Sequence, residues 1–325
     1  MRRQLALLLL PLLVLTACSD EPAEPAEEAS PSESAEPLAD IADIEVGGDI
    51  GEAATVEVGG GFDTDTSVSR VATAGTGAPV QAEQALRLDY AIFDAATGEA
   101  GTATYEQGAQ NLVLTPQTVI QPFIDALVGV PVGSRVVLVV PPEETAAEAS
   151  EDANTAIFVL DVEAAFAARA TGTPVAPPAG LPAVTIGDLG KPTIAIPAQE
   201  PPAELLVQPL VTGTGPAVVA GQTLTAMYTG LKWVDGSQFD SSWDQLDPRD
   251  FPIGNGSVIP AWDIALVGQP VGSQVLMVVP PAQGYGEAGN PQAGITGTDT
   301  LVFVVDILDA RQVGALQTPT PVPMP

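Results

Sequence analysis

The sequence contains no histidine and a single cysteine, Cys18, among its 325 residues. Without histidine the chain cannot form a Ser-His-Asp triad, a Cys-His nucleophile pair or an imidazole-based zinc site. With one cysteine it cannot form an internal disulfide, so its fold rests on packing. The acidic clusters near the N-terminus also lack the spacing of a calcium loop. We therefore expect no bound metal.

Basic residues are scarce as well, with 10 Lys and Arg against 41 Asp and Glu and a net charge of −31. Nucleic acid and anionic lipid both repel a chain this acidic, so we expect neither as an electrostatic partner. We interpret the acidity as a property that keeps an extracellular protein soluble.

The first 18 residues have the pattern of an export signal. Arg2 and Arg3 precede an apolar run from residue 5 to residue 15, and small residues precede Cys18. This order is typical of a signal peptide, and the run is short for a membrane span. Leu15-Thr-Ala-Cys18 resembles the lipobox of bacterial lipoproteins, which implies that Cys18 is lipidated and anchors an extracytoplasmic protein to the bacterial cell membrane. The alternative is an ordinary signal peptide with a chance cysteine.

Two segments have the composition of disordered chain. Residues 19–49 begin with a long stretch of Glu, Pro, Ala and Ser, and residues 313–325 are rich in proline. Such segments bury too little apolar surface to offset the entropy of ordering. We expect a disordered acidic linker at 19–49 and a disordered tail at 313–325.

The middle of the chain contains an internal repeat. The pattern Ala-Leu-Val-Gly-X-Pro-Val-Gly-Ser occurs at residues 126–134 and again at 265–273. Internal duplication predicts two domains of the same fold, which we place at residues 50–170 and 183–312. Residues 171–182 between them contain prolines and glycines that break helices and central strands, as expected of a linker.

Each repeat contains short β-rich runs and one short helix. The runs are 86–93, 136–140 and 156–162 in the first repeat, and 223–229, 274–279 and 300–307 in the second. The helices are expected after Ile120 and after Ile259, the second beginning at Pro260 and stopping at Gly268. This pattern predicts an α+β fold with mainly antiparallel sheets.

Aromatic residues make up only 5% of the chain, and many gather in the second repeat. All three tryptophans lie between residues 227 and 308. Aromatic side chains among glycine-punctuated strands can build a rigid apolar pocket with a few polar tips. The same window contains Tyr-Thr-Gly at 228–230, Phe-Asp-Ser-Ser at 239–242, Val-Ile-Pro-Ala-Trp at 258–262 and Gly-Tyr-Gly at 284–286.

These blocks, in this order and spacing, resemble the FKBP-type peptidyl-prolyl cis-trans isomerases over roughly the last third of the chain. The resemblance implies a twisted antiparallel sheet wrapped on one short helix, with a proline-binding pocket between them. Together with the repeat it implies two FKBP-like domains, of which residues 183–312 form the isomerase domain.

The resemblance also implies a role for each pocket residue. The floor under the proline ring is Trp262. The other substrate-binding residues are Phe239, Phe251, Val258, Ile259, Ile295 and Phe303. The catalytic residues are Tyr228, Asp240, Ile259 through its backbone N–H, and Tyr285 through its hydroxyl. Taken singly, Trp262 also fits a plain core residue and Asp240 a turn residue; the assignment depends on their occurring together.

Rotation about the bond before proline breaks no covalent bond, so a catalyst of this reaction needs no nucleophile, metal or cofactor. Its barrier is about 18–20 kcal/mol. The planar amide is more polar than the twisted one, so a dry aromatic pocket favours the twisted form.

The sequence departs from the family in several places. Asn290 stands where the family often has histidine, and Arg249 is the arginine available to pair with Asp240. In the first repeat Phe123 replaces the tryptophan and Leu112 stands for Phe251, while the Phe-Asp-Ser-Ser and Gly-Tyr-Gly blocks are missing. We expect the first domain to fold but to have little or no isomerase activity.

The leading hypothesis is a membrane-tethered isomerase that assists the folding of exported proteins at X-Pro bonds, with proline-containing polypeptides as clients. The alternative is a non-catalytic lipoprotein chaperone or interaction module that binds proline-containing segments. A solute-binding lipoprotein is disfavoured because the chain lacks a two-lobed α/β pattern. The sequence predicts no particular oligomeric state.

Overall fold

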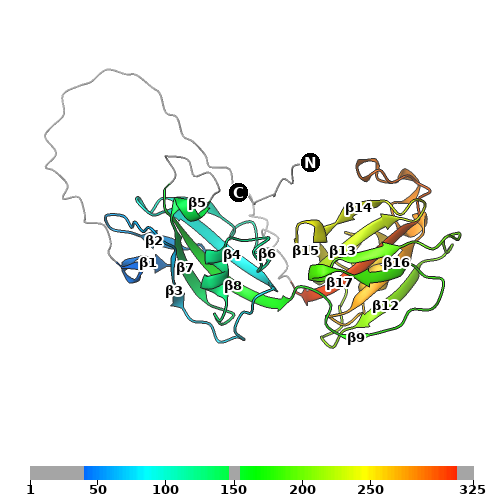
Figure 1. Cartoon of the computed structure of the whole chain (residues 1–325), viewed down its shortest axis with the longest axis horizontal. Helices are drawn as coiled ribbons and strands as arrows, with labels where there is room; N and C mark the ends of the chain where they lie inside the picture. The colour runs from blue at the N-terminus through cyan, green and yellow to red at the C-terminus, as the bar shows by residue number, and fades with distance from the viewer. Residues whose placement is uncertain (1–39, 146–153, 313–325) are drawn as a thin grey trace, which may run out of the picture. The chain divides into compact units, whose positions relative to one another are not determined.

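The computed structural model describes residues 40–145 and 154–312, so the expected signal peptide, Cys18 and the tail from residue 313 lie outside the described residues. The chain forms two compact units, the first mainly from residues up to 165 and the second mainly from residue 166 onward (Figure 1). The domain boundaries expected from the repeat stay predictions. No helix in the described ranges is long and apolar enough to cross a membrane.

The second unit is built on an antiparallel sheet in the order β14-β13-β17-β16-β12-β9, with β15 also paired to β13. Its strands are β9 (Thr173–Pro174), β12 (Leu206–Thr212), β13 (Thr223–Lys232), β14 (Gln238–Ser241), β15 (Arg249–Pro252), β16 (Gln274–Val279) and β17 (Leu301–Arg311). The three expected β-rich runs thus form β13, β16 and β17, inside the sheet. The proline-containing linker contributes only the two-residue edge strand β9, where a missing N–H donor is tolerated.

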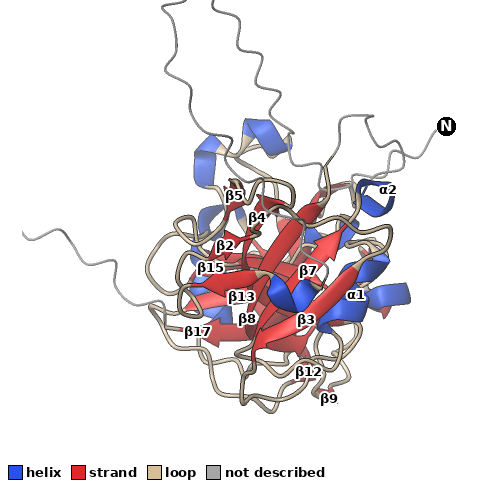
Figure 2. Ribbon diagram, turned by 90° about the vertical axis from the view of Figure 1, so that its left-hand side faces the viewer, coloured by secondary structure: helices blue, strands red, loops and turns tan. Residues whose placement is uncertain are grey.

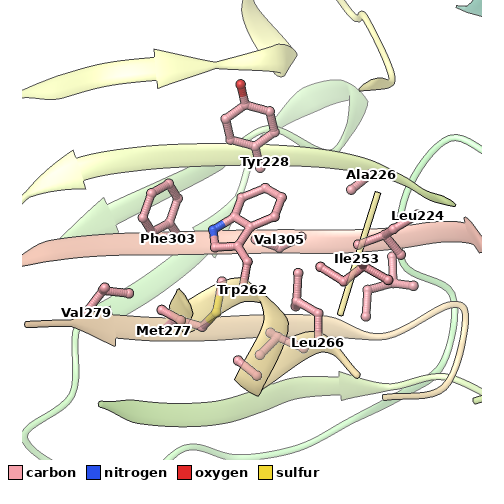
Figure 3. Packing of buried hydrophobic residues seen from close by; sticks show 14 of the residues in the cluster. Leu224, Ala226, Tyr228, Ile253, Trp262, Leu266, Met277, Val279, Phe303 and Val305 are labelled. Carbon is pink, nitrogen blue, oxygen red and sulfur yellow. The ribbon is translucent and has the colours of Figure 1, made fainter. Parts of the chain in front are cut away.

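Helix α3 (Pro260–Leu266) packs against one face of this sheet. Pro260 opens the helix, and Gly268, with a φ of 89°, follows its end as the sequence predicts. The side chains of Trp262 and Leu266 are buried with Met277 of β16 in one apolar cluster (Figure 3). Figure 2 shows that helices are a minor part of a structure made of strands and loops.

The opposite face of the sheet is covered by a hairpin of β10 (Ala183–Ile186) and β11 (Pro192–Ala195). Leu276 and Val278 of β16 belong to this second cluster, against which Val184 and Ile194 of the hairpin pack. Because both faces of the sheet are covered, β16 is buried along its whole length. This explains why its sequence is a nearly continuous apolar run without alternation.

The first unit has a sheet in the order β3-β7-β8-β4-β5, with β6 paired to β4. Its strands are β3 (Val68–Thr73), β4 (Gln84–Asp94), β5 (Ala100–Ala103), β6 (Gln110–Val113), β7 (Arg135–Val140) and β8 (Ala156–Ala167). Helix α1 (Gln121–Leu127) begins after Ile120, as predicted. The one-turn helix α2 (Pro142–Thr145) departs from the expected single helix per repeat. A proline opens it and two glutamates lie in its first turn, both favourable at a helix start.

The acidic linker ends earlier than residue 49, so this part of the prediction is wrong. A 3-10 turn (Ile41–Asp43) and a hairpin of β1 (Glu45–Gly47) and β2 (Thr55–Glu57) already belong to the first unit. Ile44 and Val56 are buried with Val137 and Val139 of β7. The sequence analysis did not identify these few apolar side chains because acidic and small residues predominate around them. Burial of each stabilises the hairpin by about 1.5–3 kcal/mol.

A buried ion pair fastens the β1–β2 loop to the first sheet. Nε and Nη2 of Arg135 each donate to the Asp161 carboxylate at 2.7 Å, and both side chains are almost fully buried. Tyr105 and the N–H of Gly51 also donate to this carboxylate, at 3.2 and 2.8 Å. The remaining guanidinium protons go to loop carbonyls at 2.6–3.0 Å, those of Gly47, Gly48, Asp49 and Glu52.

Asp306 of β17 is the buried carboxylate of the second unit, and its direct hydrogen-bond donors are neutral. Gln274 Nε2 donates to one oxygen at 2.7 Å, and the backbone N–H of Ala170 donates to the other at 2.8 Å. Burial raises the pKa of Asp306 to about 6, although these hydrogen bonds oppose the rise. The second unit therefore holds a charge that burial makes unfavourable at neutral pH.

This carboxylate should make the second unit less stable at neutral than at acidic pH. The pKa of Asp306 is higher in the folded than in the unfolded chain, so its contribution is fully present below about pH 4 and is lost as pH rises through about 6. The loss should amount to about 2–3 kcal/mol. Urea unfolding followed by tryptophan emission reports on this unit, because all three tryptophans belong to it.

The matched variant is Asp306→Asn, which should be less stable at acidic pH but should lack this part of the pH dependence. Equal slopes of unfolding free energy against pH in the two proteins would contradict the assignment. The comparison of slopes is needed because the many surface carboxylates also titrate.

Candidate active site

The second unit contains an open pocket of about 500 Å³ between β13, β14, β15, β17 and the start of α3. Its lining residues are Tyr228, Phe239, Asp240, Phe251, Ser257, Val258, Ile259, Pro260, Trp262, Gly284, Tyr285 and Phe303. The lining is largely aromatic and aliphatic with few polar groups, as in sites that bind small apolar ligand groups.

Trp262 forms the centre of an aromatic cluster. Its indole is 4% exposed and makes edge-to-face contacts with three rings, at centroid distances of 5.5 Å to Tyr228, 4.7 Å to Phe251 and 5.7 Å to Phe303. Figure 3 shows the Tyr228 ring above the indole and the Phe303 ring to its left. Such contacts add about 0.5–1.5 kcal/mol each beyond area burial, so the cluster is a rigid surface.

Phe239 and Phe303 form one wall of the pocket, with ring centroids 5.5 Å apart. They pack over Gly230 of β13, which is paired with Phe303 across the ladder. A Cβ atom at Gly230 would lie 2.5 Å from the Phe239 ring and 3.0 Å from the Phe303 ring. The wall can therefore pack this closely only because residue 230 has no side chain.

A polar cluster lies at the pocket edge. The Tyr228 hydroxyl donates to Asp240 Oδ2 and accepts a hydrogen bond from Arg249 Nη1 at 2.9 Å. Arg249 Nη1 is also 3.6 Å from Asp240 Oδ1. Burial raises the pKa of Tyr228, and the neighbouring Asp240 carboxylate raises it further. The phenol therefore stays protonated and keeps its role as a donor.

Hydroxyl groups and a helix carboxylate position the two sides of the pocket. Ser242 Oγ accepts from the N–H of Tyr228 at 2.9 Å, which fixes the residues after Asp240 against β13. On the other side, Asp263 of α3 accepts from the N–H groups of Gly254 and Gly256 at 2.6 and 2.8 Å. These bonds hold the loop that leads into Val258 and Ile259.

Besides the buried indole N–H of Trp262, which has no hydrogen-bond partner, two of the donors that the sequence analysis assigned to catalysis also have none within the described parts of the chain. One is the backbone N–H of Ile259, the residue before α3, which has extended backbone angles. The other is the hydroxyl of Tyr285, a residue that is 36% exposed on the loop after β16. Both are available to a bound carbonyl oxygen.

The segment that contains this pocket matches a known protein family. A family model described as FKBP-type peptidyl-prolyl cis-trans isomerase matches residues 215–308. The FK506-binding protein of Streptomyces anulatus is 36% identical over 118 residues, which cover 36% of this chain and 95% of that protein. The chain belongs to the FKBP-type peptidyl-prolyl cis-trans isomerase family. 

Two further relatives agree with this membership of the FKBP-type family. A probable FK506-binding protein of Corynebacterium glutamicum is 33% identical over 122 residues, 37% of this chain and 98% of that protein. The human peptidyl-prolyl cis-trans isomerase FKBP2 is 46% identical over 88 residues, 27% of this chain and 61% of that protein. The family resemblance inferred from the sequence blocks is thereby confirmed.

Nine of the ten residues predicted for the FKBP-type pocket line it together. The exception is Ile295, which is buried in the core cluster with Trp262 and is not part of the lining. Their individual roles stay predictions. The lining also includes Ser257, Pro260 and Gly284, which the sequence analysis did not select although each adjoins a selected residue.

The first unit brings fewer of these features together. Phe123 and Phe158 make an edge-to-face contact at 4.9 Å. Burial raises the pKa of Tyr90, which stands in the first repeat where Tyr228 stands in the second. Asp89, however, accepts from the Thr104 hydroxyl at 2.8 Å, and among the described residues Tyr90 has no Asp-Arg partners like those of Tyr228. The Tyr105–Asp161–Arg135 group of this unit holds the β1–β2 loop instead. In the first repeat, residues 143–152 stand where the Tyr285 loop stands in the second, and residues 146–153 lie outside the described residues.

Proposed function

We propose that the second unit catalyses cis-trans isomerisation of X-Pro bonds in the pocket over Trp262. The observation that carries this proposal is an aromatic pocket with two unpartnered donors, Ile259 N–H and Tyr285 hydroxyl, inside the segment that matches the isomerase family. Membership of the family supports the type of reaction, and the geometry of the pocket supports its assignment as the place where the reaction occurs.

The pocket geometry suits a reaction that needs desolvation and no chemical group transfer. The planar amide is stabilised by resonance, which makes it polar and well solvated, whereas the twisted amide loses this charge separation. A proline ring placed on the Trp262 indole would take the amide out of water and reduce the advantage of the planar form. The Ile259 N–H would hold a neighbouring client carbonyl, so that rotation takes place against a fixed chain.

Asp240 would act on the rotating carbonyl. When the amide twists, its carbonyl carbon receives less electron density from nitrogen and becomes more positive, so a nearby carboxylate stabilises it. The Tyr228 hydroxyl and Arg249 hold this carboxylate at the pocket edge. The stabilisation is electrostatic and requires no proton transfer.

Removal of either group should slow catalysis while the fold is kept. Tyr228→Phe and Asp240→Val should each lower kcat/KM about tenfold, because about 1.4 kcal/mol of transition-state stabilisation is lost. The measurement is a proline-limited refolding assay with the full chain. Tyr90→Phe, at the matching position of the first unit, is the control and should leave the rate unchanged.

The same assay separates catalysis from simple binding. Proline-containing peptides that bind the chain without any acceleration of refolding would support the non-catalytic interaction module instead. Full activity in Asp240→Val, with the fold intact, would place catalysis elsewhere.

We further propose that the first unit is a degenerate copy of the second. In support, its sheet order β3-β7-β8-β4-β5 matches β12-β16-β17-β13-β14, and its hairpin β1–β2 matches β10–β11. Both hairpin loops contain Gly-Asp followed by Ile or Leu and Gly, at residues 48–51 and 187–190. Because its Tyr90 lacks the polar cluster, we expect little or no isomerase activity from this unit alone.

We propose an extracytoplasmic location, with the chain anchored to the bacterial cell membrane through lipid on Cys18 and active on exported proteins. The support is the basic, apolar and small-residue pattern that ends at Cys18. Cells that express the full chain should incorporate labelled palmitate into it, and Cys18→Ala should abolish the label. Label that persists in Cys18→Ala would rule out this anchor.

A further inference from the structure

The walls of the pocket carry carboxylates on two sides. Resting on the proposed isomerase function, we infer that the preferred clients have a lysine or arginine next to the proline. The inference concerns which X-Pro sequences the pocket takes, and it depends on the charges that surround the aromatic floor. A carboxylate cluster alone would indicate no ligand, but here it borders a pocket with unpartnered donors at Ile259 and Tyr285.

One wall carries two exposed carboxylates. The side chains of Asp240 and Asp247 are 44% and 45% exposed. Asp240 lines the pocket. Asp247 Oδ2 is 3.2 Å from Arg249 Nε, and Arg249 Nη1 reaches the hydroxyl of the pocket residue Tyr228. Asp247 is therefore separated from the pocket by the width of one guanidinium.

The loop on the other wall carries Glu287. This residue is exposed in the 3-10 turn Gly286–Ala288, which follows the pocket residues Gly284 and Tyr285 directly. Tyr285 of this loop and Asp240 of β14 both line the pocket, so a client whose proline ring lies on Trp262 would contact both segments. Residues next to the proline would thus have a carboxylate on each flank.

The pocket region has one basic side chain, and it is already engaged. Arg249 contacts the Tyr228 hydroxyl, Asp240 and Asp247. From residue 250 to residue 310, which includes α3 and the Tyr285 loop, the sequence contains neither lysine nor arginine. Three carboxylates, Asp240, Asp247 and Glu287, against one guanidinium leave a net charge of −2 around the opening.

A surface charge of this size affects binding through long-range attraction and repulsion. Clefts lined by one sign of charge concentrate ligands of the opposite sign and repel those of the same sign. The effect is screened by salt, with a Debye length of about 10 Å at 0.1 M and about 3 Å at 1 M. At low ionic strength we expect kcat/KM to be about tenfold higher for Lys-Pro peptides than for Glu-Pro peptides, with an intermediate kcat/KM for Leu-Pro peptides. At 1 M salt the ratio should fall to about two.

The test uses the full chain and three peptides that differ only in Lys, Leu or Glu before proline. Isomerisation rates are measured at about 10 mM and at 1 M salt. Asp247→Asn and Glu287→Gln should each lower the Lys-to-Glu ratio two- to threefold. Glu200→Gln makes the same charge change at an exposed residue near Trp233, on the hairpin-covered face of the sheet, and should leave the ratio unchanged.

Equal kcat/KM for the three peptides at low salt would overturn the inference, and so would an effect of Glu200→Gln as large as that of Asp247→Asn. Equilibrium binding, followed by the change in tryptophan emission, keeps the inference separate from the proposed function. Tighter binding of the Lys-Pro peptide without acceleration of any peptide would uphold the charge preference and refute the isomerase proposal. Equal affinities would refute the charge preference whether or not catalysis occurs.

Discussion

Replacement of Arg135 by glutamine should destabilise the first unit by about 3–5 kcal/mol. The substitution leaves Asp161 charged and buried, with only the Tyr105 hydroxyl and the Gly51 N–H as the donors described around it. It also removes the donors for the loop carbonyls of residues 47–52. A loss of this size is a large part of the 5–15 kcal/mol that typically stabilises a domain.

Hydrogen exchange resolved over residues 40–145 measures this loss, because the first unit has no tryptophan to report on it. Arg70→Gln is the matched control. Arg70 donates to the carbonyls of Ile41 and Ile44 at 3.0 and 2.6 Å and is only partly buried, so we expect a loss of about 1 kcal/mol.

The pair of charges can be tested further in a double variant. Addition of Asp161→Asn to Arg135→Gln removes the buried charge and should recover part of the lost stability. If Arg135→Gln had no larger effect than Arg70→Gln, the ion pair would not be what fastens the hairpin to the sheet.

Gly230→Ala should lower isomerase activity about 10- to 100-fold. The new methyl group would lie 2.5 Å from the Phe239 ring and 3.0 Å from the Phe303 ring, so at least one ring has to leave its place. Overpacking of this kind typically costs about 1–3 kcal/mol, and displacement of a wall removes the surface that holds the proline. Activity should fall because the pocket changes shape, although its polar groups stay.

Peptide isomerisation and thermal unfolding, measured on the same protein, distinguish a changed pocket from an unfolded one. Gly187→Ala is the control, because its Cβ would meet only the Lys191 carbonyl oxygen, at 3.4 Å. It should retain activity. Activity of Gly230→Ala within twofold of the wild type would show that the Phe239–Phe303 wall does not contribute to catalysis.

The elements that shape the pocket were predictable because local signals and packing agree there. Pro260 and Gly268 bound α3 as expected. Apolar runs marked β16 and β17, since strands covered on both faces need apolar residues at nearly every position. The ring residues were found because glycine-punctuated blocks in a fixed order are rare in an aromatic-poor chain.

Other features depend on contacts that are distant in sequence. Ile295 is predicted to bind substrate, and it lies in the core cluster that contains Trp262 but not in the pocket lining, so its role stays a prediction. The β1–β2 hairpin was missed because the contacts that stabilise it are distant in sequence, among them those of Arg135, more than 80 residues away. The hydrogen bond from Arg249 to the Tyr228 hydroxyl depends on the pairing of β15 with β13, and this pairing could not be predicted from the sequence pattern.

The β10–β11 hairpin has a practical consequence for dissection of the chain. A fragment that starts at residue 200 would leave Leu276 and Val278 bare, so such a protein should self-associate through its uncovered sheet. A fragment that starts at residue 183 keeps the hairpin but lacks Ala170, whose backbone N–H donates a hydrogen bond to Asp306. A fragment that is meant to contain the second unit alone should therefore begin no later than residue 166.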